Sequence, residues 1–568
     1  MNEVAHAVSG AVSGKELMRH CAEFAKRVKL SGTPQELESF RYLKSCLEAY
    51  GYRTELVSHD AYISLPGGSR VEADGQELKS ITHSFSLPSP KGGLKARLID
   101  VGAGSAADFA KADCRGKIVL VDGIASPAAA ANAKQAGAVG QLHVSPHEHL
   151  HEMCISPVWG SPSDETLAEM PSTVACTVSE ADGQALRAKL EAGAKVELVL
   201  HAEVDTGWRK TPLLVAELDG PGAKDAPFVL MSGHHDTWYF GVMDNGSANA
   251  TMLEAARLMA ARRSEWRRGL RICFWSGHSH GRYSGSSWYV DQHWDDLERR
   301  CVAHVNVDST GGIGATVLTE NGVVAELVAL AKEATLAEAG QHHAGKRPSR
   351  SSDQSFWGVG IPSMYGSISH QPPSPVKMRN ALGWWWHTPH DLLDKIDEEF
   401  LSRDTRIVVS TLWHLLTDPI LPLDCAAHAC ALRKELEGIA QKLGAGFAVD
   451  RLIETAESVR MKAEAVAALK AVNDAARLEA INAALMRVSR ALVPLDYTEG
   501  DRFSHDAALP QPAWPALRKL RDLAAAKPGS DAARFLAVAA TREKNRMLHG
   551  LRQAVDALDQ ALAMPKGK

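Results

Sequence analysis

The sequence lacks any uninterrupted apolar run long enough to span a bilayer, and its first residues have neither the basic nor the apolar region of a secretory signal. It also lacks a basic excess: 63 Lys and Arg stand against 68 Asp and Glu, a net charge of -5 that gives no reason to expect a nucleic-acid partner. Its nine cysteines are scattered without CxxC spacing, which favours reduced thiols over a disulfide framework. These absences predict a soluble cytoplasmic protein that binds neither membranes nor nucleic acids.

Histidine and tryptophan are, by contrast, abundant, with 24 and 13 residues in a chain of 568. A chain of this length should form more than one domain, because single hydrophobic cores stop growing at roughly 250–300 residues. We predict an α/β domain in two parts, a β-rich insertion between them and an all-α helical bundle, at residues 1–90 and 208–420, 91–207, and 421–568. The expected strands of the insertion are 96–101, 116–122, 138–144 and 195–204, and the expected helices of the bundle are 424–443, 451–472, 475–492 and 532–563.

Three apolar segments of the second α/β part are each followed by residues that can bind a metal. Residues 228–232, 270–275 and 302–307 read as buried strands. After them come His234, the stretch Gly277-His-Ser-His-Gly281, and Asp308. Because the carboxyl ends of parallel strands meet at one edge of a sheet, we expect a site along that edge.

Histidine and aspartate side chains form the candidate ligand set. A metal site needs neutral imidazoles and carboxylates on rigid elements, and His234, Asp244, Asp308 and His387 offer them. Asp236 stands two residues after His234, a spacing suited to supporting its imidazole. Asp244 falls in a turn before a helix, where a carboxylate can bridge the two ions of a two-metal hydrolase.

These segments resemble a known family. The stretch from Ser232-Gly-His234 to Asp244-Asn-Gly-Ser looks like the first signature of the co-catalytic zinc aminopeptidases and glutamate carboxypeptidase II, and Asn306-Val-Asp308 and Trp386-His387-Thr-Pro resemble later ligand segments. The likeness extends over the whole chain and is closest to the carboxypeptidase II and transferrin-receptor branch. It implies an α/β fold, a phosphorylase/hydrolase-like zinc peptidase domain with a mixed central sheet. It also implies an inserted protease-associated domain and a homodimer formed through the C-terminal bundle.

The resemblance implies two metal positions. One metal would be bound by His234, Asp244 and Asp308, and the second by Asp244, His387 and one further ligand. In the family that further ligand is the second of two adjacent glutamates, and the first is the general base. This chain has neither glutamate.

The stretch His278-Ser279-His280 stands where the glutamates are expected, and an apparent extra residue leaves the register open. In one interpretation His280 or His278 binds the second metal and the other acts as base or acid, since imidazole is both a ligand for zinc and a proton carrier near neutral pH. In a second, a single zinc is bound, as in glutaminyl cyclases of related fold. In a third, the protein is catalytically inactive, like transferrin receptors. The retained ligands favour an active enzyme.

We therefore predict a metallohydrolase that cleaves an amide or peptide bond of a small molecule or short peptide through a metal-activated water. The expected cofactor is zinc, as one or two ions, with another divalent metal still open. Aromatic residues crowd the motifs and favour an apolar or aromatic substrate. The predicted catalytic residues are His278, His280 and Asp236, the predicted metal ligands are His234, Asp244, Asp308, His387 and His280, and the predicted substrate-binding residues are Trp238, Asp353, Gln354, Trp386 and Arg350.

Overall fold

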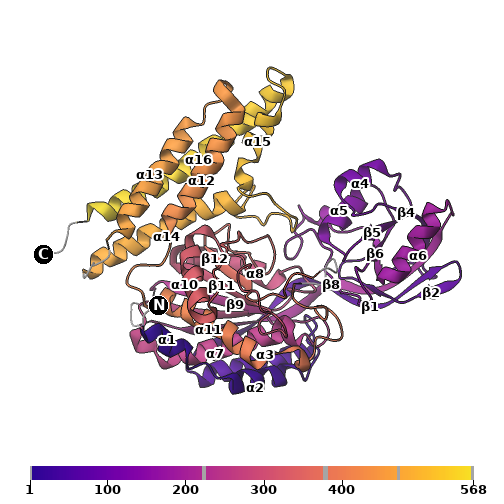
Figure 1. Cartoon of the computed structure of the whole chain (residues 1–568), viewed down its shortest axis with the longest axis horizontal. Coiled ribbons are helices and arrows are strands. Elements are labelled where there is room, and N and C mark those ends of the chain that lie inside the picture. The colour runs from indigo at the N-terminus through magenta and orange to yellow at the C-terminus, as the bar shows by residue number, and fades with distance from the viewer. Residues whose placement is uncertain (1–2, 221–224, 375–380, 470–473, 565–568) are drawn as a thin grey trace.

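The computed structural model describes residues 3–220, 225–374, 381–469 and 474–564, and it has three parts (Figure 1). An α/β part contains the central sheet, a β-rich module lies at its right in the figure, and a set of long helices lies above it at the left. Within the described ranges, no helix combines the length and the apolar character that a membrane crossing requires.

The central sheet is mixed and has the strand order β12-β11-β9-β10-β8-β1. Strands β9 to β12 are parallel, β8 is antiparallel to β10, and β1 is antiparallel to β8. Strand β9 has β10 on one side and β11 on the other, so the chain reverses its direction of winding beside β9, which is where α/β sheets bind ligands. The bounds are β1 Arg53–Ala73, β8 Glu197–Leu218, β9 Phe228–His234, β10 Gly269–Trp275, β11 Cys301–Asp308 and β12 Ser363–Ser367.

Helices cover both faces of this sheet. On one face, α7 packs on β9 and β11 and joins α1, α2, α3, α10 and α11 in the main hydrophobic core. On the other face, α8, α9 and residues 356–361 form a smaller core around Trp275. The bounds are α1 Glu3–Ser9, α2 Gly14–Phe24, α3 Pro34–Ala49, α7 Ala248–Ala261, α8 Ser284–Gln292, α9 Trp294–Arg300, α10 Val328–Ala339 and α11 Glu398–Thr417.

Strands β1 and β8 form a long ribbon that belongs to both the α/β part and the β-rich module. Their pairing runs from Arg53↔Glu217 to Ala73↔Leu198, with one irregularity between Pro66 and Ser69. The sequence predicted a strand at 195–204 and a domain boundary at 207/208, but β8 passes through that boundary without a break. Ladder hydrogen bonds to β1 hold the chain extended at 207/208, and the domain boundary itself stays a prediction.

The module is a second, smaller sheet in the order β4-β5-β6-β7-β3, joined to the ribbon where β4 pairs with β8. The predicted strands at 96–101, 116–122 and 138–144 are confirmed as β4, β5 and β6. Helix α5 begins at Pro127 after an N-cap Ser126, a residue pair typical of helix starts. The bounds are β2 Gln76–Leu78, β3 Ser80–Thr82, β4 Leu94–Asp100, β5 Ile118–Asp122, β6 Gly140–Val144, β7 Val174–Val178, α4 Ala106–Lys111, α5 Pro127–Gln135 and α6 Glu180–Glu191.

The C-terminal helices pack against each other and on the α/β part. The four predicted helices are present, although α14 continues to Tyr497, and the predicted end of α13 at Val472 lies outside the described residues. Buried Arg490 of α14 joins the two parts, since its guanidinium donates to the carbonyls of Leu297, Glu298, Cys301 and Gly360. The bounds are α12 Cys425–Leu443, α13 Asp450–Ala467, α14 Ala475–Tyr497, α15 Arg518–Ala525 and α16 Asp531–Ala563.

A second buried polar link between these parts is centred on His428 of α12. Its Nδ1 lies 3.0 Å from Glu326 Oε1 and its Nε2 lies 3.1 Å from Asp496 Oδ2. Burial alone would lower the pKa of His428, but the hydrogen bonds to Asp496 and Glu326 outweigh it and raise the pKa to about 9. His428 is therefore an imidazolium between two carboxylates, and Arg347 adds a hydrogen bond to Asp496 at 3.1 Å.

This arrangement predicts a pH-dependent stability. Because the folded-state pKa of His428 is raised, its contribution should be fully present below about pH 6.5 and lost as the pH rises to about 9. We expect His428→Gln to remove this slope, on the order of 3 kcal/mol in the free energy of unfolding. Urea unfolding at pH 6, 7.5 and 9 measures it, with exposed His549→Gln as the matched control. Equal slopes for wild type and His428→Gln would contradict the prediction.

Candidate metal centre

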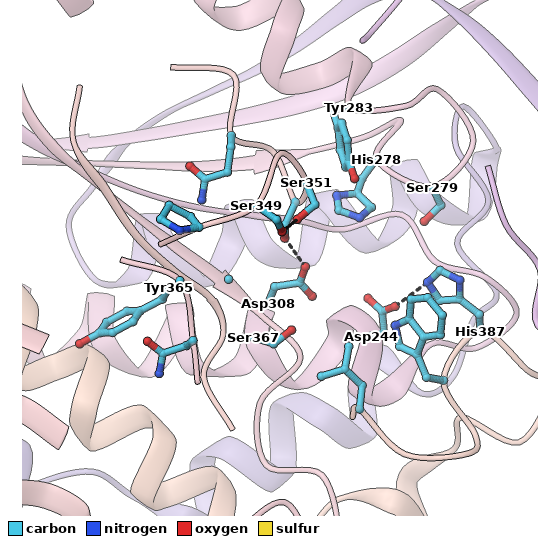
Figure 2. Close-up of a pocket in the computed structure, with 18 of the residues that line it drawn as sticks. Asp244, His278, Ser279, Tyr283, Asp308, Ser349, Ser351, Tyr365, Ser367 and His387 are labelled. Atoms are coloured by element: carbon cyan, nitrogen blue, oxygen red, sulfur yellow. Dashed lines mark hydrogen bonds and ion pairs between the residues drawn. The ribbon is translucent and has the colours of Figure 1, made fainter. Parts of the chain in front are cut away.

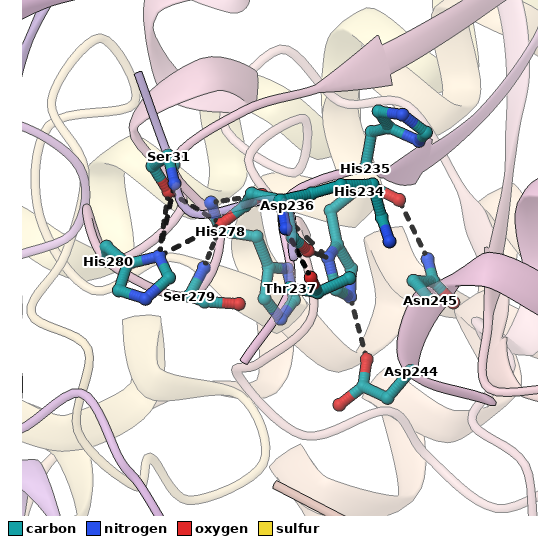
Figure 3. A network of polar contacts seen from close by, with 12 residues as sticks. Ser31, His234, His235, Asp236, Thr237, Asp244, Asn245, His278, Ser279 and His280 are labelled. Atoms are coloured by element: carbon teal, nitrogen blue, oxygen red, sulfur yellow. Dashed lines mark hydrogen bonds and ion pairs between the residues drawn. The ribbon is translucent and has the colours of Figure 1, made fainter. Parts of the chain in front are cut away.

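The site begins at His234, the last residue of β9. Its Nδ1 lies 2.9 Å from the backbone oxygen of Asp236, and a carbonyl can only accept, so Nδ1 carries the hydrogen. Its Nε2 therefore carries the lone pair, and it faces Asp244 Oδ1 at 3.0 Å without forming a hydrogen bond (Figure 3). A cation between His234 Nε2 and Asp244 Oδ1 would satisfy both of these buried lone pairs.

His387 faces the other oxygen of Asp244. Its Nδ1 donates to the backbone oxygen of Glu152 at 2.7 Å, so its Nε2 again carries the lone pair. That Nε2 lies 3.0 Å from Asp244 Oδ2, as Figure 2 shows. Each oxygen of Asp244 is thus paired with a different imidazole, which is the arrangement of a carboxylate that bridges two metal positions.

Asp244 is held in the short helical turn η2 (Val242–Ser247) between β9 and α7. The carboxylate of Asp391 accepts hydrogen bonds from the backbone N–H groups of Met243, at 2.8 Å, and Asp244, at 3.0 Å. Burial raises the pKa of Asp391 to about 7. Asp391 comes four residues after His387, so one short segment supplies a donor atom and also fixes the bridging carboxylate.

Asp308, the last residue of β11, and His278, which follows β10, complete the group. Single ligand atoms of His234, His278 and Asp308 all lie within 4.8 Å of one another. His278 Nδ1 donates to Asp353 Oδ2 at 2.6 Å, so its Nε2 carries a lone pair, as do the Nε2 atoms of His234 and His387. Ser352 Oγ donates to the Asp308 carboxylate at 2.5 Å and orients it.

The charges of these groups favour a cation. Burial would raise the pKa of Asp244, but the imidazoles of His234 and His387 beside its two oxygens hold it well below its usual range. Burial would lower the pKa of His234, but Asp244 and Asp308 raise it well above its usual range. Two ionised carboxylates therefore draw a positive charge to His234 Nε2, and either a proton or a metal ion supplies it. The donor set of imidazole nitrogens and carboxylate oxygens suits zinc.

His280 is not part of this group. It is fully buried, with Nδ1 3.0 Å from Ser31 Oγ and 3.7 Å from Asp236 Oδ2, and its ring packs 4.4 Å from that of Trp238. It does not line the pocket, whereas His278 and Ser279 do. The expectation that His280 binds a metal or acts as the base is therefore not supported. Of the three residues His278-Ser279-His280, the first two therefore stand at the pocket, which favours the register that starts from strand β10.

Asp236 fixes the His278-Ser279 loop. Its carboxylate accepts the backbone N–H groups of His278 at 3.2 Å and Ser279 at 2.9 Å, and the hydroxyl of Ser31 at 2.8 Å (Figure 3). Burial would raise the pKa of Asp236, but His280, His234 and His278 lower it well below its usual range. Asp236 is thus a positioning residue and does not enter the pocket.

The other predicted pocket residues divide into three groups. Trp238, Gln354 and Trp386 line a pocket of about 440 Å³ that contains Asp244, Asp308 and His387. Asp353 lies behind His278 and is buried. Arg350 does not reach the pocket, because its guanidinium donates to the backbone oxygens of Asp506 and Ala507.

Sequence reasoning did not identify the residues through which the module contacts the site. Residues 147–152 lie along residues 384–387: Glu152 N–H donates to His387 O at 3.1 Å, and His151 Nδ1 donates to Trp386 O at 2.5 Å. Burial lowers the pKa of His151 to about 3, so its ring is neutral. His149 stacks on Trp384 with ring centroids 4.2 Å apart. The histidine-rich run was the available signal, but its partner lies more than 230 positions away in the chain.

Fold and donors together point to a metal-dependent hydrolase domain with a mixed α/β fold. Residues 214–412 match the profile of peptidase family M28. A probable glutamate carboxypeptidase of Zea mays is 20% identical over 74% of this chain and 69% of its own length, and another of Arabidopsis thaliana is 24% identical over 47% and 42%. An aminopeptidase of Bacillus subtilis is 24% identical over 68% of this chain and 80% of its own.

Solved structures show the same fold. An aminopeptidase from Aneurinibacillus sp. strain AM-1 superposes with a TM-score of 0.56 at 22% identity, over 72% of this chain and 96% of that chain. A family M28 peptidase precursor from Shewanella amazonensis gives a TM-score of 0.58 at 19% identity, over 72% and 95%. At these identities the likeness establishes the mixed α/β architecture.

Proposed function

We propose that the site hydrolyses an amide or peptide bond with zinc as its metal. The observation that carries the proposal is that three histidines share one tautomer, with hydrogen on Nδ1 and the lone pair on Nε2. His234, His278 and His387 each donate Nδ1–H to a fixed acceptor and so present Nε2 toward the two carboxylates. The match to the M28 family profile supports the choice of metal, as does the name of one solved structure, a zinc aminopeptidase from Bacillus subtilis.

Two metal positions of unequal strength follow from the donors. The first has His234, Asp244 Oδ1 and Asp308, with His278 beside them. The second has Asp244 Oδ2 and His387 as its charged or imidazole donors among the described residues, and Ser279 lines the same pocket. A zinc ion held there would lower the pKa of water and polarise the substrate carbonyl.

His278 is proposed to handle the proton. The carboxylate of Asp353 accepts its Nδ1–H, and Ser286 Oγ in turn donates to Asp353 at 2.7 Å. These two hydrogen bonds fix the tautomer of His278. Its Nε2 is then the atom that accepts a proton in the pocket and returns it to the leaving amine. The side chain of His278 is 15% exposed, which gives it access to a substrate while Asp353 stays buried.

The pocket favours small substrates with an apolar group. Its volume of about 440 Å³ suits a dipeptide or a comparable amide, and Trp238, Tyr283 and Trp386 are among its walls. The β-rich module is proposed to act as a protease-associated domain that closes one side of this pocket, supported by its contacts with Trp386 and His387.

The C-terminal helices are proposed to form a homodimer. Large apolar side chains stand exposed on α13 and α16, namely Met461 at 57%, Val538 at 54% and Phe535 at 76% exposure. A cytoplasmic location is likewise a proposal, supported by nine cysteines that are all free.

Titrating zinc into protein that a chelator has stripped of metal tests the proposal. We expect two binding events of unequal affinity, and zinc-dependent cleavage of N-acyl dipeptides that transfers one oxygen from ¹⁸O-labelled water to the product acid. A single event would show a one-zinc enzyme. Absence of zinc binding would overturn the proposal, and a product without solvent oxygen would indicate cyclisation instead of hydrolysis.

A further inference from the structure

The pocket wall contains one arginine, Arg282, without an acidic partner in the described part of the chain. The other basic side chains of the pocket are paired: Lys346 lies 3.6 Å from Glu320, and Arg347 lies 3.0 Å from Asp496. Arg282 forms no ion pair with any described residue, and its Nε is buried without a hydrogen-bond partner. Arg282 is half-buried, and its buried Nε–H lacks the acceptor that would replace water there.

The backbone of Arg282 is held in place. Arg282 and Tyr283 have φ angles of 48° and 71°, a left-handed conformation that side-chain-bearing residues rarely adopt. Gly160 of the module donates its N–H to Arg282 O at 2.6 Å. These two residues lie in the segment between Ser279 and α8, and this backbone conformation places an arginine in the pocket wall.

Residues from all three parts of the molecule support this wall. The ring of Tyr283 lies 4.8 Å from that of His278, and the guanidinium of Arg282 lies 4.9 Å from the Tyr283 ring. Trp159 of the module packs on Tyr283 at 4.3 Å, and Arg350 covers Trp159 at 4.2 Å. Arg350, which the sequence predicted to bind substrate, thus packs behind Trp159 and Tyr283, and Arg282 is the arginine at the pocket wall.

We propose that Arg282 binds a carboxylate of the substrate, so that the preferred substrates are short peptides or N-acyl amino acids with a free carboxylate beside the amide that is cleaved. A guanidinium presents a planar fork of donors that matches a carboxylate. Tyr283, Trp238 and Trp386 provide apolar surface in the same pocket, which suits an apolar or aromatic residue bearing that carboxylate. The inference rests on the proposed amide hydrolysis and names the substrate class for it.

Kinetics with matched substrates test the inference. We compare alanyl-phenylalanine and N-acetyl-alanyl-phenylalanine with their C-terminal amides on zinc-loaded protein. The wild type should prefer the free acids, and Arg282→Ala should lower kcat/KM for the acids about 10- to 100-fold while leaving the amides within about threefold. Arg282→Lys should recover part of the loss. Lys346→Met, a paired cation of the same pocket, is the control and should alter both substrate types equally. Equal effects of Arg282→Ala on acids and amides would overturn the inference.

A binding measurement separates this inference from the proposed function. Calorimetry with N-acetyl-phenylalanine and its amide on zinc-loaded protein should show tighter binding of the acid in wild type, lost in Arg282→Ala. If none of the substrates is cleaved but this difference is present, the hydrolysis proposal fails and the role of Arg282 stands. If cleavage occurs and the acid and amide bind equally in both proteins, the role of Arg282 fails and hydrolysis stands.

Discussion

Asp244→Asn is expected to remove zinc from both positions and to lower kcat/KM by about 10³-fold or more, equivalent to at least about 4 kcal/mol of transition-state stabilisation. The reason is the double role of one side chain. Each oxygen of Asp244 lies 3.0 Å from a different imidazole nitrogen, so no other residue replaces it at either position. An amide has one oxygen and no charge, and its NH₂ group would face one of the two imidazoles.

Metal content and thermal unfolding together check this prediction. Without zinc, Asp244→Asn should unfold at or below the wild-type temperature, because the lowered pKa of Asp244 means that its ionised carboxylate stabilises the folded state at neutral pH. With zinc, only the wild type should gain stability, since a ligand stabilises the state that binds it. Exposed Asp219→Asn is the control and should behave as wild type. An Asp244→Asn protein that still binds two zinc ions per chain would contradict the bridging assignment.

Local patterns in the sequence were sufficient for most elements of the fold. Helical spacing located the C-terminal helices within a few residues, and continuous apolar runs located β9, β10 and β11. The β1–β8 ribbon could not be predicted in full. Its middle portion alternates irregularly between exposed and half-buried positions as it passes from one sheet to the other, so it carries no single period. Pairing of distant segments, not local pattern, makes it one element.

The candidate site likewise has residues that the sequence could predict and residues that it could not. His234, Asp244, Asp308 and His387 were assigned from motifs and lie together in the structure. The stretch after β10 was ambiguous, because two residues there that are not glycine are left-handed, and nothing in the residue types indicates that conformation. The choice between His278 and His280 depends on packing against Ser31 and Asp353, which are far away in sequence.

Replacing His278 is expected to have the second large effect on catalysis. His278→Gln is expected to lower kcat by about 10²- to 10⁴-fold with KM nearly unchanged, the range for loss of a positioned acid–base group. His278 Nε2 points into the pocket because Asp353 holds Nδ1, and a glutamine at that position cannot take up the proton. Zinc content should remain at two ions per chain, since His234, Asp308 and Asp244 still hold the first position.

His280→Gln is the matched control for this substitution, because it changes the other histidine of the same loop. His280 contacts Ser31, Asp236 and Trp238 behind the pocket, so we expect less than about a tenfold loss in kcat and unchanged zinc binding. If the His278 variant instead loses one zinc ion, His278 is a ligand of the first position and the proton must be carried by another group. If the His280 variant shows the larger loss, the two histidines exchange roles. Steady-state kinetics and metal analysis on the two variants therefore decide which imidazole replaces the missing glutamates.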